Sequence, residues 1–183
     1  MDAEAYISQH WLPNDIARNL KSARHQQRFD WIAERVPKGR WLQYADVGCA
    51  CGHSTVELEK RAVGDWHGID FSQTAIDEAQ RLFPQNLFHY FTSPAQMIEM
   101  GHFHGVVCSE VLEHVPDPKA MVRALIEITG DTLVLTTPGR KVGDPGHLRT
   151  YAAETLRAEF PDEGLLKIET LGIFLFATWK RLS

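Results

Sequence analysis

The stretch YADVGCACGHSTVEL, from Tyr44 to Leu58, places a run of small residues between an apolar segment and a helical pattern. Gly48, Ala50 and Gly52 fall in that run. A glycine-rich turn between a strand and a helix lets a ligand approach the backbone, and the amides at the helix N-terminus carry a partial positive charge. We therefore interpret residues 44–58 as a strand, a candidate binding turn and the start of a helix.

The rest of the chain repeats this alternation. Strands are expected at about 41–47, 66–71, 87–91, 105–110 and 132–138, and helices at about 53–62, 72–83, 117–129 and 152–160, with a loop at 92–97. Residues 14–36 predict one long helix or two short ones. Strands alternating with helices indicate a doubly wound α/β sheet that is mostly parallel. Segments 165–172 and 173–181 meet at Gly172 with no room for a crossover helix, so we predict a hairpin and an antiparallel last strand.

Composition narrows the class of protein. The chain has 183 residues, 44% hydrophobic and 23% charged, which is typical of one globular domain. A net charge of -5 argues against general nucleic-acid binding. No apolar run approaches the ~18 residues that span a bilayer, and the first residues do not resemble a signal peptide, so we expect a cytoplasmic protein without a transmembrane segment. Cys49, Cys51 and Cys108 suit neither a disulfide framework nor a metal knuckle.

Two acids accompany the turn. Asp46 stands just before Gly48, where its carboxylate can meet a cationic group, and Asp70 closes the next strand, where a carboxylate can accept the hydroxyls of a ribose. The dinucleotide fingerprint GxGxxG fits poorly, because Ala50 and His53 occupy its second and third glycine positions. A nicotinamide-dependent oxidoreductase is therefore the weaker alternative.

Four motifs, DVGCACG, GIDFS, GVVCSEVLEHVPDP and LVLTTPGR, follow one another in the order and spacing of class I S-adenosylmethionine-dependent methyltransferases. The chain resembles in particular the group of ubiquinone-biosynthesis O-methyltransferases. The resemblance implies a seven-stranded Rossmann-like sheet, S-adenosylmethionine as cofactor, and O-methylation of a small-molecule, glycan or lipid-like acceptor. A non-catalytic cofactor-binding module is a further alternative.

The resemblance also implies a set of cofactor-binding residues. Asp46, Gly48 and Gly52 would cradle the methionine portion, Asp70 would hold the ribose, and Phe71 would lie against the adenine. Pro94 departs from the acid or serine common at the adenine edge. The whole cofactor set is Arg28, Asp46, Gly48, Cys49, Ala50, Gly52, Asp70, Phe71, Ser93, Ala95 and Ser109. Arg28 is expected near the cofactor carboxylate or an acidic substrate.

The segment CSEVLEHVPDP should lie beside this turn, because ligands bind at the carboxyl ends of the strands. His114 is the candidate general base, since an imidazole accepts a proton near neutral pH, with Glu113 and His147 as the other catalytic candidates. A second hypothesis places a divalent cation on Glu110, Glu113, His114 and His147, similar to the site of small-RNA 2'-O-methyltransferases.

The remaining predictions concern the surroundings of the site. Arg149 and Tyr151 are expected to line the acceptor pocket, Arg149 as a partner for a carboxylate or phosphate. Residues 1–38 are expected to form a helical segment that covers the site, with Tyr6 and Trp11 in the cover, and residues 39–183 to form the methyltransferase core. Because no inserted substrate domain is evident, the pocket would be completed by this segment or by a partner, for example in a homodimer.

Overall fold

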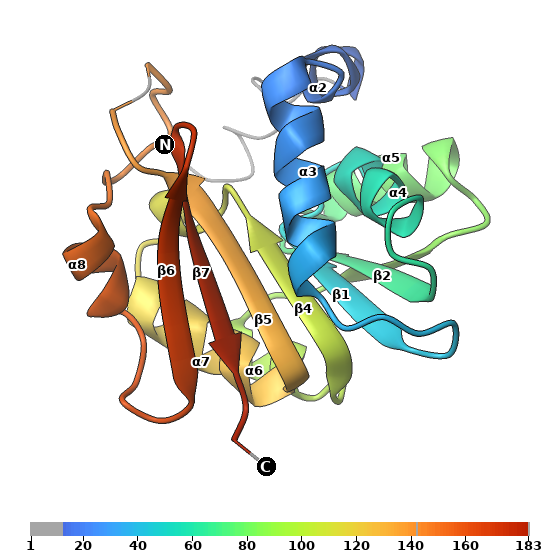
Figure 1. Ribbon diagram of the computed structural model, residues 1–183. Helices are drawn as coiled ribbons and strands as arrows, with labels where there is room; N and C mark the ends of the chain where they lie inside the picture. The colour runs from blue at the N-terminus through green and yellow to red at the C-terminus, as the bar shows by residue number, and fades with distance from the viewer. Residues whose placement is uncertain (1–12, 142, 183) are drawn as a thin grey trace.

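The computed structural model describes residues 13–141 and 143–182, which form a seven-stranded sheet with helices on both faces (Figure 1). The strand order is β3-β2-β1-β4-β5-β7-β6. The strands are β1 (Gln43–Val47), β2 (Asp65–Asp70), β3 (Leu87–Tyr90), β4 (Phe103–Ser109), β5 (Thr129–Pro138), β6 (Leu165–Leu171) and β7 (Phe174–Lys180). Strands β1 to β5 pair in parallel, and β7 is antiparallel to both β5 and β6. This arrangement confirms the predicted fold and the hairpin at Gly172.

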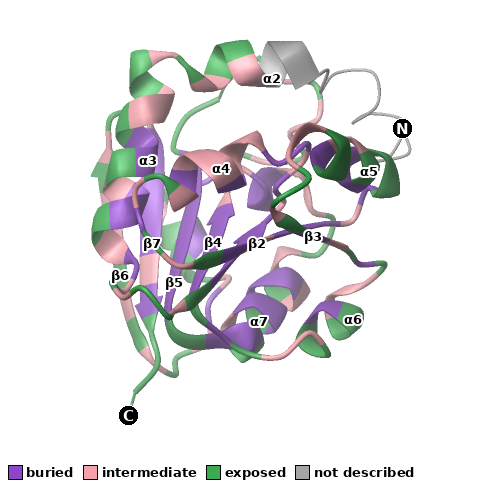
Figure 2. Ribbon diagram, turned by 90° about the vertical axis from the view of Figure 1, so that its right-hand side faces the viewer, coloured by how far each residue is buried: buried purple, intermediate pink, exposed green. Residues whose placement is uncertain are grey.

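The helices divide into two layers (Figure 2). They are α2 (Pro13–Leu20), α3 (Ala23–Arg35), α4 (His53–Glu59), α5 (Gln73–Leu82), α6 (Pro94–Ile98), the single 3-10 turn η1 (Leu112–His114), α7 (Pro118–Ile128) and α8 (Ala153–Arg157). Helices α3, α4 and α5 pack on one face of the sheet, and α6, α7 and α8 on the other. The sheet is therefore covered on both sides, as doubly wound topology requires.

The structure decides between the two alternatives for one segment and departs from the sequence pattern in another. Residues 14–36 form two helices, because the chain turns at Lys21 and Ser22 between α2 and α3. The expected loop at 92–97 contains the short helix α6. Ser93 caps this helix by accepting a hydrogen bond from the Gln96 amide, and Pro94 occupies its first turn, where a missing amide hydrogen costs nothing.

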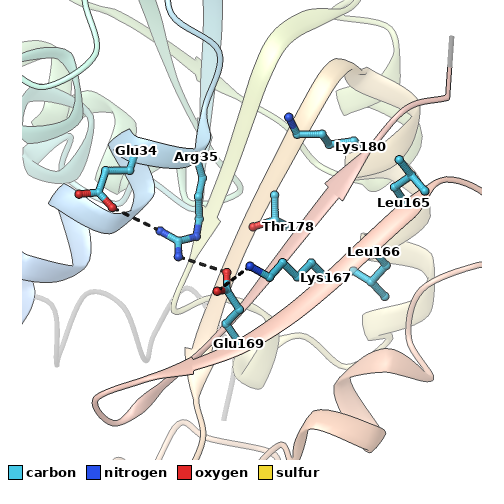
Figure 3. Close-up of a pocket in the computed structure, with 8 residues that line it drawn as sticks. All are labelled: Glu34, Arg35, Leu165, Leu166, Lys167, Glu169, Thr178 and Lys180. Carbon is cyan, nitrogen blue, oxygen red and sulfur yellow. Dashed lines mark hydrogen bonds and ion pairs between the residues drawn. The ribbon is translucent and has the colours of Figure 1, made fainter.

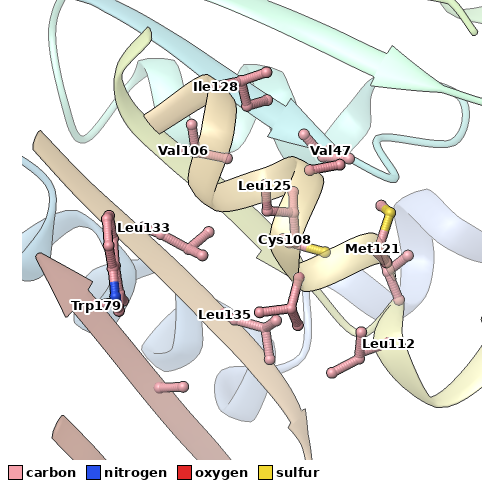
Figure 4. Packing of buried hydrophobic residues seen from close by; sticks show 14 of the residues in the cluster. Val47, Val106, Cys108, Leu112, Met121, Leu125, Ile128, Leu133, Leu135 and Trp179 are labelled. Carbon is pink, nitrogen blue, oxygen red and sulfur yellow. The ribbon is translucent and has the colours of Figure 1, made fainter. Parts of the chain in front are cut away.

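The larger core lies between the sheet and the layer of α6, α7 and α8 (Figure 4). Leu112 and Leu125 meet Val106 and Leu135 of the sheet there, all without exposed surface. The cysteines Cys49, Cys51 and Cys108 are also buried and unpaired. None of the described helices has the length and apolar composition needed to cross a membrane.

Helix α3 belongs to the second core, on the opposite face. Phe29 and Ile32 have 0% exposed surface and share a cluster with Val107 of β4 and Phe176 of β7. Burying side chains of this size contributes about 1.5–3 kcal/mol each, so residues 23–35 are held firmly on the sheet. The predicted cover formed by Tyr6 and Trp11 lies outside the described residues.

Candidate functional site

A cavity of about 480 Å³ opens at the carboxyl ends of the parallel strands. Its lining combines the turn after β1, the segment after β4, the loop after β5, the hairpin of β6 and β7, and the α2–α3 region. The lining residues are Asn19, Leu20, Arg24, His25, Arg28, Gly48, Cys49, Ala50, Ser54, Ser109, Glu110, Glu113, His114, Pro138, Gly143, Asp144, Pro145, His147, Ile173 and Phe174. Ligands of doubly wound sheets bind in this position.

The turn after β1 forms one wall of the cavity. Gly48 has φ +83°, and a Cβ there would lie 2.2 Å from Cγ2 of Val111, so no side chain fits. The amides of Gly48 and Cys49 both donate to the carbonyl of Ile69, at 2.7 and 3.2 Å. Ala50 adopts φ 46°, a left-handed conformation that costs a residue with a Cβ about 1–2 kcal/mol. Tertiary contacts hold the turn in this shape.

The two acids beside the turn support it. Asp46 is 1% exposed, and its Oδ2 accepts hydrogen bonds from Ser54 Oγ at 2.7 Å and Thr55 Oγ1 at 2.8 Å. Asp70 is 3% exposed and accepts from the Ala50 amide through Oδ2 and from the Ser72 amide through Oδ1, both at 2.9 Å. Burial raises the pKa of Asp70 to about 6, although these amides act in the opposite direction. A carboxylate has further lone pairs, so ribose binding by Asp70 is compatible with both bonds.

The predicted cofactor set divides by its position relative to the cavity. Five residues of the predicted set line the cavity: Arg28, Gly48, Cys49, Ala50 and Ser109. The structure also describes the other six, which do not line it: Asp46, Gly52, Asp70, Phe71, Ser93 and Ala95.

The residues expected at the adenine have other contacts. The ring of Phe71 meets Phe91 edge-on, with centroids 6.5 Å apart. Ser93 uses its hydroxyl to cap α6, while Ala95 is exposed. Their roles toward a cofactor therefore stay predictions.

Arg28 and Glu110 form a buried ion pair on the cavity wall. Arg28 is 4% exposed, its Nη1 lies 3.5 Å from Glu110 Oε2, and its guanidinium stands 5.1 Å from the ring centroid of Phe174. Its Nε and Nη1 have no hydrogen-bond partner among the described residues. Glu110 Oε1 accepts from Thr136 Oγ1 at 3.0 Å, and Glu110 itself has φ 60°. A buried guanidinium with unused donors is suited to an anionic ligand group.

Three of the four predicted metal ligands converge. Ligand atoms of Glu113, His114 and His147 all lie within 4.8 Å of one another. Glu113 is 1% exposed; its Oε2 accepts from Thr137 Oγ1 at 3.1 Å, while Oε1 has no hydrogen-bond partner and lies 3.9 Å from His147 Nε2. Burial and the charge of Glu110 raise the pKa of Glu113 well above its usual range. Glu110 is not part of this cluster, because its carboxylate faces Arg28 and Thr136.

The hydrogen bond of His114 defines the tautomer of its ring. His114 Nδ1 lies 3.0 Å from the carbonyl oxygen of Gly146, which can only accept. Nδ1 therefore carries the proton, and the lone pair of the neutral ring is on Nε2. Burial and the neighbouring His147 lower the pKa of His114, so the neutral form dominates near pH 7.

Comparison with known proteins places this geometry in a family. Residues 45–129 match the family model described as a methyltransferase domain. The ubiquinone biosynthesis O-methyltransferase of Xanthomonas campestris is 31% identical over 156 residues, which cover 76% of this chain and 61% of that enzyme. These matches support a class I S-adenosylmethionine-dependent methyltransferase. The chain spans less than two thirds of the length of the Xanthomonas enzyme.

Solved methyltransferase structures share the fold. Magnesium protoporphyrin IX methyltransferase from Synechocystis, solved with bound S-adenosylmethionine, superposes with a TM-score of 0.67 at 17% identity and covers 100% of this chain and 98% of its own. A TehB-like S-adenosylmethionine-dependent methyltransferase from Corynebacterium glutamicum gives a TM-score of 0.69 at 18% identity, covering 98% of each chain. The methyltransferase family match leaves the nicotinamide-dependent alternative without support.

Arg149 does not line the cavity as expected. Its guanidinium donates to three backbone carbonyls of the segment after β4, those of Leu112, Val115 and Pro116. The Leu148 amide also donates to the Glu113 carbonyl at 2.9 Å. These bonds tie the loop that carries His147 to the segment that carries His114. The sequence could not reveal them, because backbone carbonyls more than thirty residues away carry no sequence signal.

The prediction that Tyr151 lines the acceptor pocket is also wrong. The residue is 3% exposed and packs in the larger core.

A second hollow, of about 470 Å³, lies between the end of α3 and strands β6 and β7 (Figure 3). Several of its charged residues pair with one another: Glu169 accepts from Arg35 Nη2 at 3.2 Å and pairs with Lys167 Nζ at 2.8 Å. The hollow is far from the carboxyl ends of the parallel strands and shares no lining residue with the first cavity. We therefore place the functional site in the first cavity.

The buried carboxylate of Asp70 should leave a signature in the pH dependence of stability. Its pKa is about 6 in the folded chain, against an ordinary value near 3.8, so the folded state binds more protons between these values. Stability should therefore fall by up to about 3 kcal/mol as the pH rises from about 4 to 6. Urea denaturation of wild type and Asp70→Asn between pH 4 and 7 should show this component only in the wild type. Parallel pH curves for the two proteins would contradict it.

The bonds of Arg149 predict a stabilising role. Arg149→Ala removes three hydrogen bonds to carbonyls of the segment after β4, which should lower the free energy of unfolding by about 2–3 kcal/mol. Urea denaturation measures this loss. Arg140→Ala, at an exposed position of the same loop, is the matched control and should change stability by no more than about 0.5 kcal/mol. Equal effects of the two substitutions would show that the bonds of Arg149 contribute nothing.

Proposed function

We propose that this chain transfers a methyl group from S-adenosylmethionine to a hydroxyl oxygen of a small-molecule acceptor. The observation that carries the proposal is the single cavity that joins the turn at Gly48 with Glu113, His114 and His147. The name of the Xanthomonas relative, an O-methyltransferase, supports oxygen as the acceptor atom. Glycan and lipid-like acceptors stay predictions from the sequence, as does a homodimer.

The residues of the turn suit the cofactor. Gly48 lines the cavity, and its lack of a side chain lets Val111 pack directly against the turn on the Cβ side. Arg28 offers Nε and Nη1 donors that no described residue accepts, suitable for the carboxylate of the methionine portion. Asp70 stands at the end of β2, the usual place for a ribose acid. When bound, S-adenosylmethionine supplies a methyl group on a positively charged sulfonium.

The task of the protein is then to align the acceptor and to remove its proton. The hydroxyl oxygen forms the new bond to the methyl carbon while the carbon–sulfur bond breaks, and its electron pair neutralises the sulfonium. We assign the proton of the hydroxyl to Nε2 of His114, because Nδ1 is already protonated and held by Gly146. The carbonyl of Gly146 also orients the resulting imidazolium. Glu113 and His147 border the same space and position the acceptor.

The cluster of Glu113, His114 and His147 also fits a divalent cation. Glu113 Oε1 is buried without a hydrogen-bond partner, which is costly unless a ligand or cation completes it. One carboxylate and two imidazoles are a common donor set for transition metals. A bound cation would occupy the Nε2 lone pair of His114, so the roles of ligand and general base are alternatives; the cation would instead supply a positive charge that lowers the pKa of an acceptor hydroxyl. Glu110 is left out of the proposed set, because it pairs with Arg28.

Cofactor binding is the first test of the function. Calorimetric titration should show saturable binding of S-adenosylmethionine and no binding of NADH. Gly48→Ala should weaken the binding at least about tenfold, because the added Cβ collides with Val111. The matched control is Gly101→Ala, since Gly101 also has a positive φ but nothing lies within 4 Å of the added Cβ. Absence of S-adenosylmethionine binding by the wild type would refute the proposed function.

Metal binding is tested separately with Mn²⁺. The wild type should bind the ion in a titration followed by electron paramagnetic resonance, and Glu113→Gln should weaken binding at least about tenfold. Glu110→Gln is the discriminating control: it should leave the affinity unchanged if three residues hold the ion, and reduce it if four do. A wild type that binds no Mn²⁺ would leave His114 as the base without a cation.

A further inference from the structure

The N-terminal half of α3 forms a basic wall on one side of the cavity. Arg24, His25 and Arg28 all line it. The guanidinium of Arg28 stands 5.1 Å from the ring centroid of Phe174, and the ring centroid of His25 lies 6.1 Å from that of Phe174. Phe174 begins β7 and pairs with Pro138 at the end of β5. This wall therefore stands over the β5–β7 side of the cavity, whereas the cofactor turn follows β1.

Arg24 forms no salt bridge with any residue that the structure describes, although its charge acts on Glu110 at longer range and lowers the pKa of that carboxyl. It is exposed, and the chain as a whole carries a net charge of -5. Its nearest charged neighbour on the helix is Arg28, four residues on, which already pairs with Glu110 at 3.5 Å. Two like charges on one turn of a cavity wall repel each other unless an anion joins them.

His25 supplies a second, independent sign of a missing partner. Its Nδ1 is buried without a hydrogen-bond partner. Burial and the charges of Arg28 and Arg24 lower the pKa of His25 to about 4, so the ring is neutral at pH 7 and can donate one hydrogen bond. A buried polar nitrogen left unpaired is costly, and in the tautomer with the proton on Nδ1 an anion between Arg24 and His25 would satisfy both residues.

We propose that Arg24 and His25 form a subsite for an anionic group of the methyl acceptor, a carboxylate or a phosphate. This inference rests on the proposed function and specifies its acceptor: a hydroxylated small acid, with the hydroxyl directed to His114 and the anion to the α3 wall. Arg28 remains with Glu110 and the cofactor. The subsite is thus separate from the cofactor-binding residues, and its loss should spare cofactor affinity.

Matched catechols test the proposal by calorimetry in the presence of saturating S-adenosylhomocysteine. The probes are 3,4-dihydroxybenzoate, its neutral analogue 3,4-dihydroxybenzamide and 3,4-dihydroxybenzylphosphonate. The wild type should bind at least one of the two anions about tenfold more tightly than the amide, and the tighter anion identifies a carboxylate or a phosphate subsite. Equal affinities for all three probes, or no binding of either anion, would overturn the proposal.

Three variants locate the effect. Arg24→Glu should abolish the preference for the anion and Arg24→Gln should reduce it, while both keep the affinity for S-adenosylhomocysteine within about twofold. Arg123→Glu changes the net charge equally on the exposed side of α7, across the sheet from α3, and should keep the preference (Figure 2). A preference that survives Arg24→Glu would overturn the subsite. Failure of the wild type to bind S-adenosylhomocysteine would instead refute the proposed function, and with it the inference.

Discussion

The site depends on the bonds that hold the turn after β1 against the end of β2. Asp70 accepts from the Ala50 amide, and the carbonyl of Ile69 accepts from both Gly48 and Cys49. These bonds stabilise the left-handed backbone conformation of Ala50, which a residue with a side chain disfavours. They also keep the backbone of Gly48 facing the cavity. Because Asp70 is buried, the bonds to the turn are accepted by a carboxylate with a raised pKa, which lies beside the turn and outside the cavity lining.

On the side of the cavity proposed for the acceptor, hydrogen bonds join two loops. Arg149 and Leu148, which follow His147, bond to the backbone of the segment that carries Glu113 and His114. The ring of His114 bonds in turn to the carbonyl of Gly146. The three side chains of the cluster therefore keep a common geometry although they come from two separate loops. The same contacts decide the tautomer of His114, which is the basis of its proposed role as the base.

Charge is distributed unevenly around the cavity. Glu110 and Glu113 are largely buried on its floor, and Arg28 compensates only the first of them directly. The N-terminal part of α3 adds positive charge to the same cavity lining, while apolar residues such as Phe29 anchor the helix to the sheet. In the proposed function, cations held on this helix over the strand ends would favour anionic ligand groups. The proposed functions of Arg28 toward the cofactor and of Arg24 toward the acceptor both follow from this arrangement.

Periodicity and motif order in the sequence determined the α/β sheet, the antiparallel last strand and the position of the binding turn, since these features depend on local patterns and short-range connections. The sequence also indicated Glu113, His114 and His147 as one group. Tertiary structure alone decided that Glu110 pairs with Arg28, that Arg149 bonds to the backbone of a distant segment, and that Tyr151 lies in the core. Side-chain direction and backbone hydrogen bonds depend on packing between segments far apart in the chain, and the residue pattern of either segment alone does not record them.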